Sequence, residues 1–262
     1  MGRKSCFDED SCLVIAHRGA SAAQPENTLP AFRAAIDAGA DAVELDVRVT
    51  SDGVGVAIHD PDVSRTTDGD GLVHELSLGE VRRLSIPTSE GPAVGIPTLD
   101  EVVALVGDRA GIMFEIKNLP GLPGFDPFDE PGVEETLRAI SEGPVPALVA
   151  SFNPRSIERC RDIARERVQT GFLSSSAMDP DTSIRYAASA GHRWILPNIT
   201  ALRSAGEDVI LRAHDSGIRV GCWVADDPAD IEMLISWGAD AVITNVPEIA
   251  VPLRDGSGGG LR

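Results

Sequence analysis

Two hydrophobic periods follow one another repeatedly along this chain. Short apolar runs, typical of buried strands, alternate with longer segments in which apolar residues recur at helical spacing. That order predicts repeated β-α units and therefore a mostly parallel sheet. The runs that we predict to be the eight principal strands are 13–16, 42–47, 112–116, 147–150, 169–173, 194–196, 219–223 and 241–244.

The ends of several elements are also marked in the sequence. A further strand over 54–58 is predicted to pair with the second strand, because the intervening Asp52-Gly53 dipeptide favours positive φ. Thr28 before Pro30 predicts a helix start. Ser77 with Glu80, and Thr98 with Glu101, have the spacing of capping boxes.

An internal repeat distinguishes residues that build the scaffold from residues that carry chemistry. The stretch 39–44 reads Gly-Ala-Asp-Ala-Val-Glu, and 238–243 reads Gly-Ala-Asp-Ala-Val-Ile. Each glycine stands where a helix is expected to stop. Both copies therefore predict a turn from a helix into a strand, but only the first copy continues with acids, Glu44 and Asp46.

The length of 262 residues is usual for one eight-stranded α/β barrel, and no Pro/Gly/Ser-rich break divides the middle of the chain. We predict a single domain over residues 1–255 with the fold of a distorted (β/α)8 TIM barrel. Residues 62–96 are predicted to be an insertion after the second strand, a small lid or wall whose deletion would alter substrate choice more than stability. The glycine-rich tail 256–262 is predicted to be disordered.

Composition narrows the function classes. The formal charge is −18, from 23 basic and 41 acidic residues, which argues against a nucleic-acid partner. The acidic surface is compatible with salt adaptation or with a GC-rich genome.

Neither a signal peptide nor an apolar run long enough to span a membrane occurs, so we predict a cytoplasmic protein without a membrane anchor, as a monomer or homodimer. Four scattered cysteines predict reduced thiols.

Polar residues with useful chemistry cluster at the ends of apolar runs between positions 15 and 60. Neutral imidazoles move protons near pH 7, paired carboxylates hold divalent cations, and a guanidinium recognises phosphate. This combination indicates phosphate-ester hydrolysis. The segments are His17-Arg18-Gly19, Pro25-Glu26-Asn27-Thr28, Glu44-Leu45-Asp46 and His59-Asp60.

The ordered series of these segments resembles the glycerophosphodiester phosphodiesterase family, and an ordered series is a stronger signal than any single tripeptide. The resemblance spans nearly the whole chain. Its later members are Arg65-Thr66-Thr67, Ile96-Pro97-Thr98-Leu99, Glu115-Ile116-Lys117, Trp223, 238–240 and Thr244-Asn245-Val246-Pro247.

The resemblance implies that Glu44, Asp46 and Glu115 are metal ligands. Alternation along a strand agrees, since Glu44 and Asp46 point to the same face, and an all-oxygen set favours Mg²⁺ or Ca²⁺. The resemblance also implies acid/base roles for two histidines, and we assign His17 as the base and His59 as the acid. The alternative for the acids is a purely structural set of ion pairs with Arg18, Lys117 and Arg48.

Further residues have expected supporting roles. Arg18 and Lys117 are predicted to neutralise the phosphoryl oxygens. Trp223 is either an apolar wall for the glycerol carbons or a core residue. Asn27 is interpreted as structural, and Glu26 is left open. Asp60 and Arg65 are interpreted as orienting groups, and His74, His192 and His214 as surface or packing residues.

The family pattern often has threonine after the tryptophan and aspartate in the Thr-x-x-Pro turn. This chain has Val224 and Asn245 at those positions. Because neither was expected to touch the metal or proton-transfer groups, we interpret both departures as affecting fine substrate preference.

The expected reaction is metal-dependent hydrolysis of a glycerophosphodiester to sn-glycerol 3-phosphate and an alcohol. Either the glycerol 2-hydroxyl, through a cyclic phosphate, or water would attack. The alternatives are a lysophospholipase-D-like activity and a non-catalytic barrel that binds phosphate esters; an aldolase or isomerase barrel is weaker.

Overall fold

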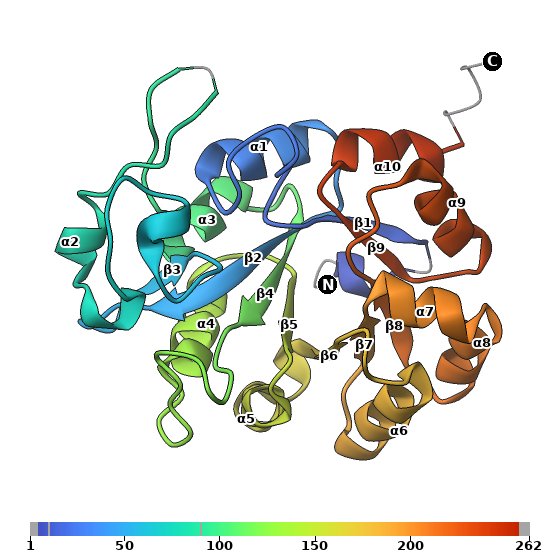
Figure 1. Cartoon of the computed structure of the whole chain (residues 1–262). Coiled ribbons are helices and arrows are strands. Elements are labelled where there is room, and N and C mark those ends of the chain that lie inside the picture. The colour runs from blue at the N-terminus through green and yellow to red at the C-terminus, as the bar shows by residue number, and fades with distance from the viewer. Residues whose placement is uncertain (1–4, 10, 90, 257–262) are drawn as a thin grey trace.

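Among the described residues, eight parallel strands form a closed barrel, and a ninth strand, β3, lies outside it. The computed structural model describes residues 5–9, 11–89 and 91–256. The strand order is β1-β9-β8-β7-β6-β5-β4-β2-β3, and an additional pairing of β1 with β2 closes the sheet. Neighbours within the barrel are parallel, whereas β3 runs antiparallel to β2. Helices surround the strands (Figure 1), which confirms the predicted TIM barrel.

The observed strands lie within two residues of the predicted ranges. Their bounds are β1 Leu13–Ala16, β2 Ala42–Val49, β3 Gly55–Ala57, β4 Gly111–Ile116, β5 Ala147–Ser151, β6 Gln169–Ser174, β7 Trp194–Pro197, β8 Arg219–Cys222 and β9 Ala241–Thr244. The helices are α1 Leu29–Asp37, α2 Leu78–Val81, α3 Leu99–Val106, α4 Pro131–Glu142, α5 Pro154–Ala164, α6 Pro180–Ala190, α7 Ile199–Ala205, α8 Asp208–Asp215, α9 Pro228–Ser236 and α10 Pro247–Arg254. None of these helices is long and apolar enough to cross a membrane.

Strand alternation divides the core into two apolar layers. Leu13 and Ile15 of β1 belong to a cluster that fills the barrel, whereas Val14 and Ala16 belong to a larger cluster between strands and helices. This division follows from side chains that point alternately to the two faces of a strand. The barrel interior is therefore packed toward its amino end, and polar groups can gather only at the carboxyl end.

An aromatic residue near the amino terminus packs into this filled end. Phe7, in the 3-10 turn η1 Cys6–Asp8, is fully buried and meets Trp194 edge-on with ring centroids 6.4 Å apart. Gly111 at the start of β4 leaves the necessary room, because a Cβ there would lie 2.9 Å from the Phe7 ring. The polar composition of residues 1–11 gave no indication of this contact.

The sequence signals that were predicted to mark helix starts and helix-to-strand turns are confirmed. Ser77 and Thr98 form reciprocal capping boxes with Glu80 and Glu101. In both copies of the repeat the glycine has positive φ and the aspartate carboxylate accepts a backbone N–H from a neighbouring strand. Asp41 binds Val14 at 2.7 Å, and Asp240 binds Val220 at 2.8 Å. The repeated Gly-Ala-Asp thus fixes the turn from helix to strand at two places in the barrel.

The segment 62–96 has its own small apolar cluster beside the barrel. Two 3-10 turns, η2 Val63–Arg65 and η3 Val73–Glu75, and α2 surround it (Figure 1). Val56 and Ile58 contribute from the β3 region, so the segment packs on the barrel through them. Its proposed effect on substrate choice stays a prediction. The predicted disordered tail lies outside the described residues, apart from Gly256.

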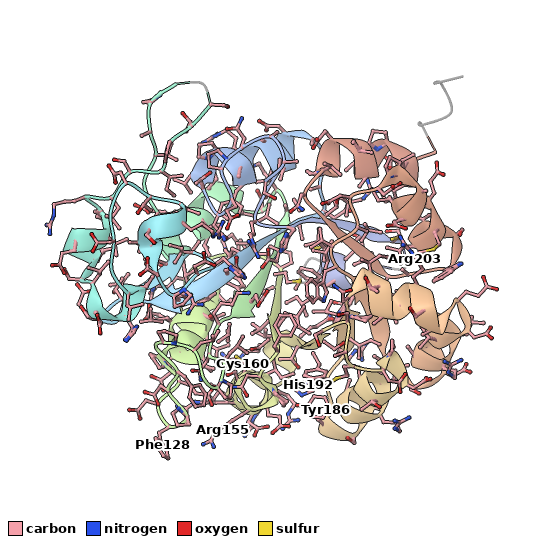
Figure 2. The ribbon with its side chains drawn as sticks, viewed as in Figure 1. Phe128, Arg155, Cys160, Tyr186, His192 and Arg203 are labelled. Atoms are coloured by element: carbon pink, nitrogen blue, oxygen red, sulfur yellow. The ribbon has the colours of Figure 1, made fainter. Side chains whose placement is uncertain are left out.

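A buried histidine lies away from the barrel mouth. His192 is 2% exposed, and its Nδ1 lies 2.7 Å from Thr170 Oγ1. Tyr186 lies beside it in Figure 2, with 3.3 Å between the hydroxyl and Nε2. This confirms the interpretation of His192 as a packing residue. Burial, assisted by the Arg161 charge, lowers the pKa of His192 to about 4.

We expect His192 to make stability fall as the medium becomes acidic. The folded pKa lies below the unfolded value, so the contribution is complete above pH 6.5 and is lost as pH falls toward 4. Between pH 8 and pH 5 the loss is about 2 kcal/mol. Urea unfolding of wild type and His192→Gln across this range measures it. The variant should show a shallower slope, and identical slopes would contradict the assignment.

Candidate active site

Most of the predicted site residues line one cavity at the carboxyl ends of the strands. The cavity has a volume of about 300 Å³ and is lined by His17, Arg18, Glu44, His59, Glu115, Lys117 and Trp223 among others. Asp46 lies beside it with no exposed surface. Residues far apart in sequence therefore meet at one end of the barrel, as the order of strands and helices predicted.

The register of β2 against β4 brings the acids together. Asp46 pairs directly with Glu115 across the two strands, and Glu44 precedes Asp46 by two residues on the same face. One carboxylate oxygen from each of the three residues lies within 4.8 Å of the others. All three side chains are at least 93% buried. Parallel pairing thus concentrates negative charge in a place without solvent.

Two cations offset this charge. Lys117 Nζ lies 2.9 Å from Asp46 Oδ1 and also contacts Glu115. Arg18 Nε lies 3.0 Å from Asp46 Oδ2, and the Arg18 backbone N–H donates to Glu44 at 2.8 Å. The structural ion pairs considered as an alternative are therefore present for these two cations.

The acids differ in how well they are compensated. Burial raises the pKa of Glu44 well above its usual range, and the charges of Asp46 and Glu115 add to this effect. Burial also raises the pKa of Glu115, although Lys117 opposes the shift. Burial alone would raise the pKa of Asp46 as well, but Lys117 and Arg18 lower it below the ordinary value. Asp46 is consequently the acid most firmly held in its charged form.

The turn after β1 has a conformation that directs Arg18 toward the acids. Arg18 has a φ of 57°, and Gly19 follows with a φ of 81°. A Cβ at Gly19 would lie 2.5 Å from the backbone of Ala31, so only glycine fits. Asn27 also has positive φ; its amide donates to Asp46 Oδ2 at 2.7 Å and accepts the Asp46 N–H at 3.2 Å. Asn27 is structural, as expected, and its structural task is to orient Asp46.

His17 is held by the residue that was expected not to touch the proton-transfer groups. Asn245 Oδ1 lies 2.8 Å from His17 Nδ1 and also accepts from Ser21, while the Asn245 amide nitrogen donates to Asp226. That expectation for Asn245 was wrong. The chain end of β9 approaches β1 when the barrel closes, which sequence alone could not show.

These contacts assign the tautomer of His17. Because the Asn245 oxygen is an acceptor, His17 Nδ1 carries the hydrogen and Nε2 has a free lone pair. Burial and the Arg18 charge lower the pKa of His17, against the opposing charge of Asp46. His17 is thus neutral near pH 7.

A chain of ionic contacts crosses the rim of the cavity. His59 Nδ1 lies 2.6 Å from Asp60 Oδ1, and the other Asp60 oxygen accepts from Arg65. Arg65 also binds Glu26 at 2.6 Å, and Glu26 accepts from Arg18 at 3.1 Å. Arg65 thus bonds two carboxylates, in agreement with its interpretation as an orienting group. Glu26, left open from the sequence, links the two arginines.

The opposite wall of the cavity is apolar. Trp223 is partly buried and packs edge-on against Phe152 with centroids 5.4 Å apart. Its indole N–H donates to the Leu196 carbonyl at 2.8 Å. Met113, Leu173, Val224 and Ile243 complete this wall. Of these, only Val224 was singled out from the sequence, as a departure from the family pattern.

The donor set fits a divalent cation. Glu44 Oε1 is buried and has no hydrogen-bond partner among the described residues, so one carboxylate oxygen in the cluster is left for another ligand. Carboxylate oxygens from neighbouring strands are the ligands that Mg²⁺ and Ca²⁺ prefer. The cluster therefore suits a hard cation better than Zn²⁺.

This chain is a (β/α)8 barrel whose acids, imidazoles and cations gather at the carboxyl ends of its strands. Barrel enzymes carry their active sites at that end. Comparison with known proteins identifies the class more closely. Residues 17–249 match the glycerophosphoryl diester phosphodiesterase family. The chain belongs to this family of hydrolases.

Individual relatives agree over nearly their full lengths. The chain is 35% identical to a glycerophosphodiester phosphodiesterase of Caldanaerobacter subterraneus subsp. tengcongensis, over 92% of this chain and 97% of the relative. The crystal structure of a Thermotoga maritima glycerophosphodiester phosphodiesterase has a TM-score of 0.75 at 27% identity, covering 92% and 98% of the two chains. An Oleispira antarctica phosphodiesterase in complex with the product sn-glycerol-3-phosphate has the same fold, with a TM-score of 0.82 at 24% identity and coverage of 96% and 100%.

Removing the positive charge of Lys117 should destabilise the fold strongly. Lys117→Met leaves the Asp46 and Glu115 carboxylates buried beside Arg18 alone. We expect a loss of about 3–5 kcal/mol in the free energy of unfolding, the usual cost of breaking a buried pair on one side. Denaturant unfolding in a chelator measures it, with Arg33→Gln on the exposed face of α1 as the control. A Lys117 variant as stable as wild type would contradict this account.

Proposed function

We propose that this enzyme hydrolyses glycerophosphodiesters to sn-glycerol 3-phosphate and an alcohol, with a divalent cation and two histidines. The observation that carries the proposal is the meeting of three buried carboxylates with His17 and His59 at one cavity. Family membership gives the substrate class, and the product named for the Oleispira relative supports the assignment of glycerol 3-phosphate.

Glu44, Asp46 and Glu115 are the proposed ligands of Mg²⁺ or Ca²⁺. When bound, such a cation would polarise the phosphodiester and offset the charge of the acids. Lys117 and Arg18 would then be released in part from their carboxylate partners and could face phosphoryl oxygens instead. The two cations therefore have a structural role in one state and a substrate-binding role in the other.

His17 is proposed as the general base. Its Nδ1 hydrogen is held by Asn245, so the free Nε2 lone pair can accept a proton from the attacking oxygen. Burial keeps the imidazole neutral, which is the state that a base needs. The attacking oxygen is the glycerol 2-hydroxyl or a water molecule.

His59 is proposed as the general acid. Its partner is the carboxylate of Asp60, which favours the protonated imidazole, whereas the partner of His17 is a neutral amide. Burial still lowers the pKa of His59 on balance, with Lys117 and Arg18 adding to that effect and Asp46 and Asp60 opposing it. Of the two partners, only the Asp60 carboxylate favours a protonated imidazole, which is the state that a general acid needs.

Trp223 and Phe152 are proposed to pack against the carbon atoms of the glycerol. The same wall leaves room for the second candidate, a lysophospholipase-D-like activity, because an acyl chain also needs an apolar surface. The cytoplasmic location and the monomer or homodimer stay predictions.

The proposal predicts metal-dependent release of glycerol 3-phosphate from glycerophosphocholine or a related diester. Chelation should abolish turnover, and His17→Ala should lower kcat by about 10²–10⁴-fold because one proton-transfer group is lost. His214→Ala, an exposed histidine paired with Asp240, is the matched control and should retain activity.

Three results would redirect the proposal. Clean activity without both site histidines would defeat it. Faster turnover of lysophospholipids than of deacylated diesters would favour the second candidate. Tight binding of diesters without turnover under any metal would favour a non-catalytic barrel.

Asn245 gives a pH test of the base. Asn245→Asp places a carboxylate 2.8 Å from the His17 ring nitrogen and should raise the pKa of His17. Since the base must be neutral, the acidic limb of the kcat/KM profile should move up by about one pH unit or more.

The neighbouring Asp226 supplies the matched variant. Asn245→Asp with Asp226→Asn exchanges the amide and the carboxylate, so the hydrogen bond between positions 245 and 226 is kept. This double variant separates the pKa effect from repulsion between two acids. An unchanged acidic limb in both variants would show that His17 is not the group that must be neutral.

A further inference from the structure

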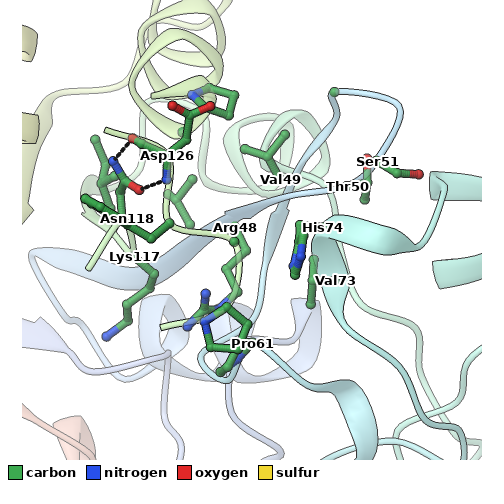
Figure 3. A pocket seen from close by; sticks show the side chains of 18 residues that line it. Arg48, Val49, Thr50, Ser51, Pro61, Val73, His74, Lys117, Asn118 and Asp126 are labelled. Carbon is green, nitrogen blue, oxygen red and sulfur yellow. Dashed lines mark hydrogen bonds between the residues drawn. The ribbon is translucent and has the colours of Figure 1, made fainter. Parts of the chain in front are cut away.

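A second cavity adjoins the site on the side of the insertion. Its volume is about 480 Å³, and it lies between the ends of β2 and β4, the loop that follows β4, and η3 of the insertion (Figure 3). Lys117 lines both this cavity and the catalytic one. A molecule that reaches from one cavity into the other must therefore pass the lysine proposed to hold phosphoryl oxygens.

Arg48 is the notable residue of this second cavity. It follows Asp46 by two positions on β2 and is 8% exposed. Its Nε donates to the His59 carbonyl oxygen at 2.8 Å. Within residues 5–9, 11–89 and 91–256, no carboxylate lies within ion-pair distance of its guanidinium, so the structural pairing considered for Arg48 from the sequence is not found.

Burying a guanidinium without a carboxylate partner costs free energy, because its charge loses water without gaining a counter-charge. Burial lowers the pKa of Arg48, although the more distant charges of Asp46, Asp60 and Glu115 oppose this shift. Arginine presents further N–H donors beyond Nε in a planar fork that matches carboxylate and phosphate groups. An anion in the cavity would complete the charge balance of this residue.

The other polar groups of the cavity leave this position open. Asp126 is the acid of the lining, but its Oδ1 accepts the backbone N–H groups of Phe128 and Asp129. Asn118 is engaged with the Asp126 backbone through both ends of its amide, as the dashed lines in Figure 3 show. Neither side chain pairs with Arg48, so the guanidinium is a positive charge of this lining without a carboxylate partner among the described residues.

We propose that the second cavity receives the leaving alcohol of the diester and that Arg48 selects alcohols that carry an anionic group. The inference rests on the proposed function, because His59 would protonate the leaving oxygen and Arg48 holds the His59 backbone. An alcohol leaving beside His59 lies next to this cavity. Carboxylate and phosphate-monoester groups share the required chemistry, and the test separates them.

Three synthetic glycerophosphodiesters with one three-carbon alcohol chain provide the test. Their alcohols are propanol, 3-hydroxypropanoate and 1,3-propanediol monophosphate. For wild type, kcat/KM should be at least about tenfold higher for an anionic alcohol than for propanol, mainly through KM, because a hydrogen-bonded charge contact is gained. Arg48→Gln should bring the ratio close to one, and Arg48→Lys should keep part of it.

Arg33→Gln removes the same charge from the exposed face of α1 and should leave the ratio unchanged. If Arg48 only supports His59, Arg48→Gln will slow all three diesters by the same factor, which overturns the proposal. A wild type without preference among the three also overturns it.

A binding experiment distinguishes failure of the subsite from failure of the proposed function. If wild type hydrolyses none of the diesters, the proposed function fails, and calorimetry with 1,3-propanediol monophosphate and with 3-hydroxypropanoate still tests Arg48. Binding that is at least about tenfold weaker in Arg48→Gln than in Arg33→Gln supports the anion subsite. Equal binding in these two variants, or no binding to wild type, overturns it.

Discussion

The burial of three carboxylates against two cations is the interaction on which the mouth of this barrel depends. Parallel pairing of β2 with β4 places Asp46 opposite Glu115, and strand alternation adds Glu44 to the same face. Without Lys117 and Arg18 these acids would have to take up protons or move into solvent. Each cation is itself fixed by the scaffold, Lys117 just beyond the end of β4 and Arg18 by a turn that requires Gly19. The local electrostatics are therefore a property of the fold.

Ionic contacts at the rim of the cavity connect the segment 62–96 to the site. Arg65 of η2 joins Asp60 to Glu26, and these two acids contact His59 and Arg18 respectively. The segment 62–96 thus contacts the site residues through one arginine, and it packs on the β3 region through its apolar cluster. A segment attached in this way can influence both the orientation of His59, the proposed general acid, and the space beside it.

Much of this arrangement could be predicted from sequence because it depends on local rules. Period-two and helical patterns located the strands, and polar residues at strand ends located Glu44, Asp46, Glu115 and Lys117. What sequence did not show depends on barrel closure and loop conformation. The contact of Asn245 with His17 joins residues 228 positions apart, and the packing of Phe7 in the barrel depends on an absent side chain at Gly111. The apolar wall looked like ordinary core, because hydrophobic residues at strand ends carry no signal that distinguishes a cavity from packing.

The distribution of arginine and lysine explains how a strongly acidic protein can attract an anionic ester. With a formal charge of −18, the long-range field of the molecule opposes a phosphodiester. Many arginines are neutralised where they stand by surface acids, as Arg138 is by Asp100, Glu135 and Glu142. At the mouth, Arg18 and Lys117 pair with the acid cluster, and Arg48 has no carboxylate within ion-pair distance among the described residues. The positive charge of Arg48 is buried, so it acts on an anion at short range, whereas charges on the exposed surface are screened by solvent and salt.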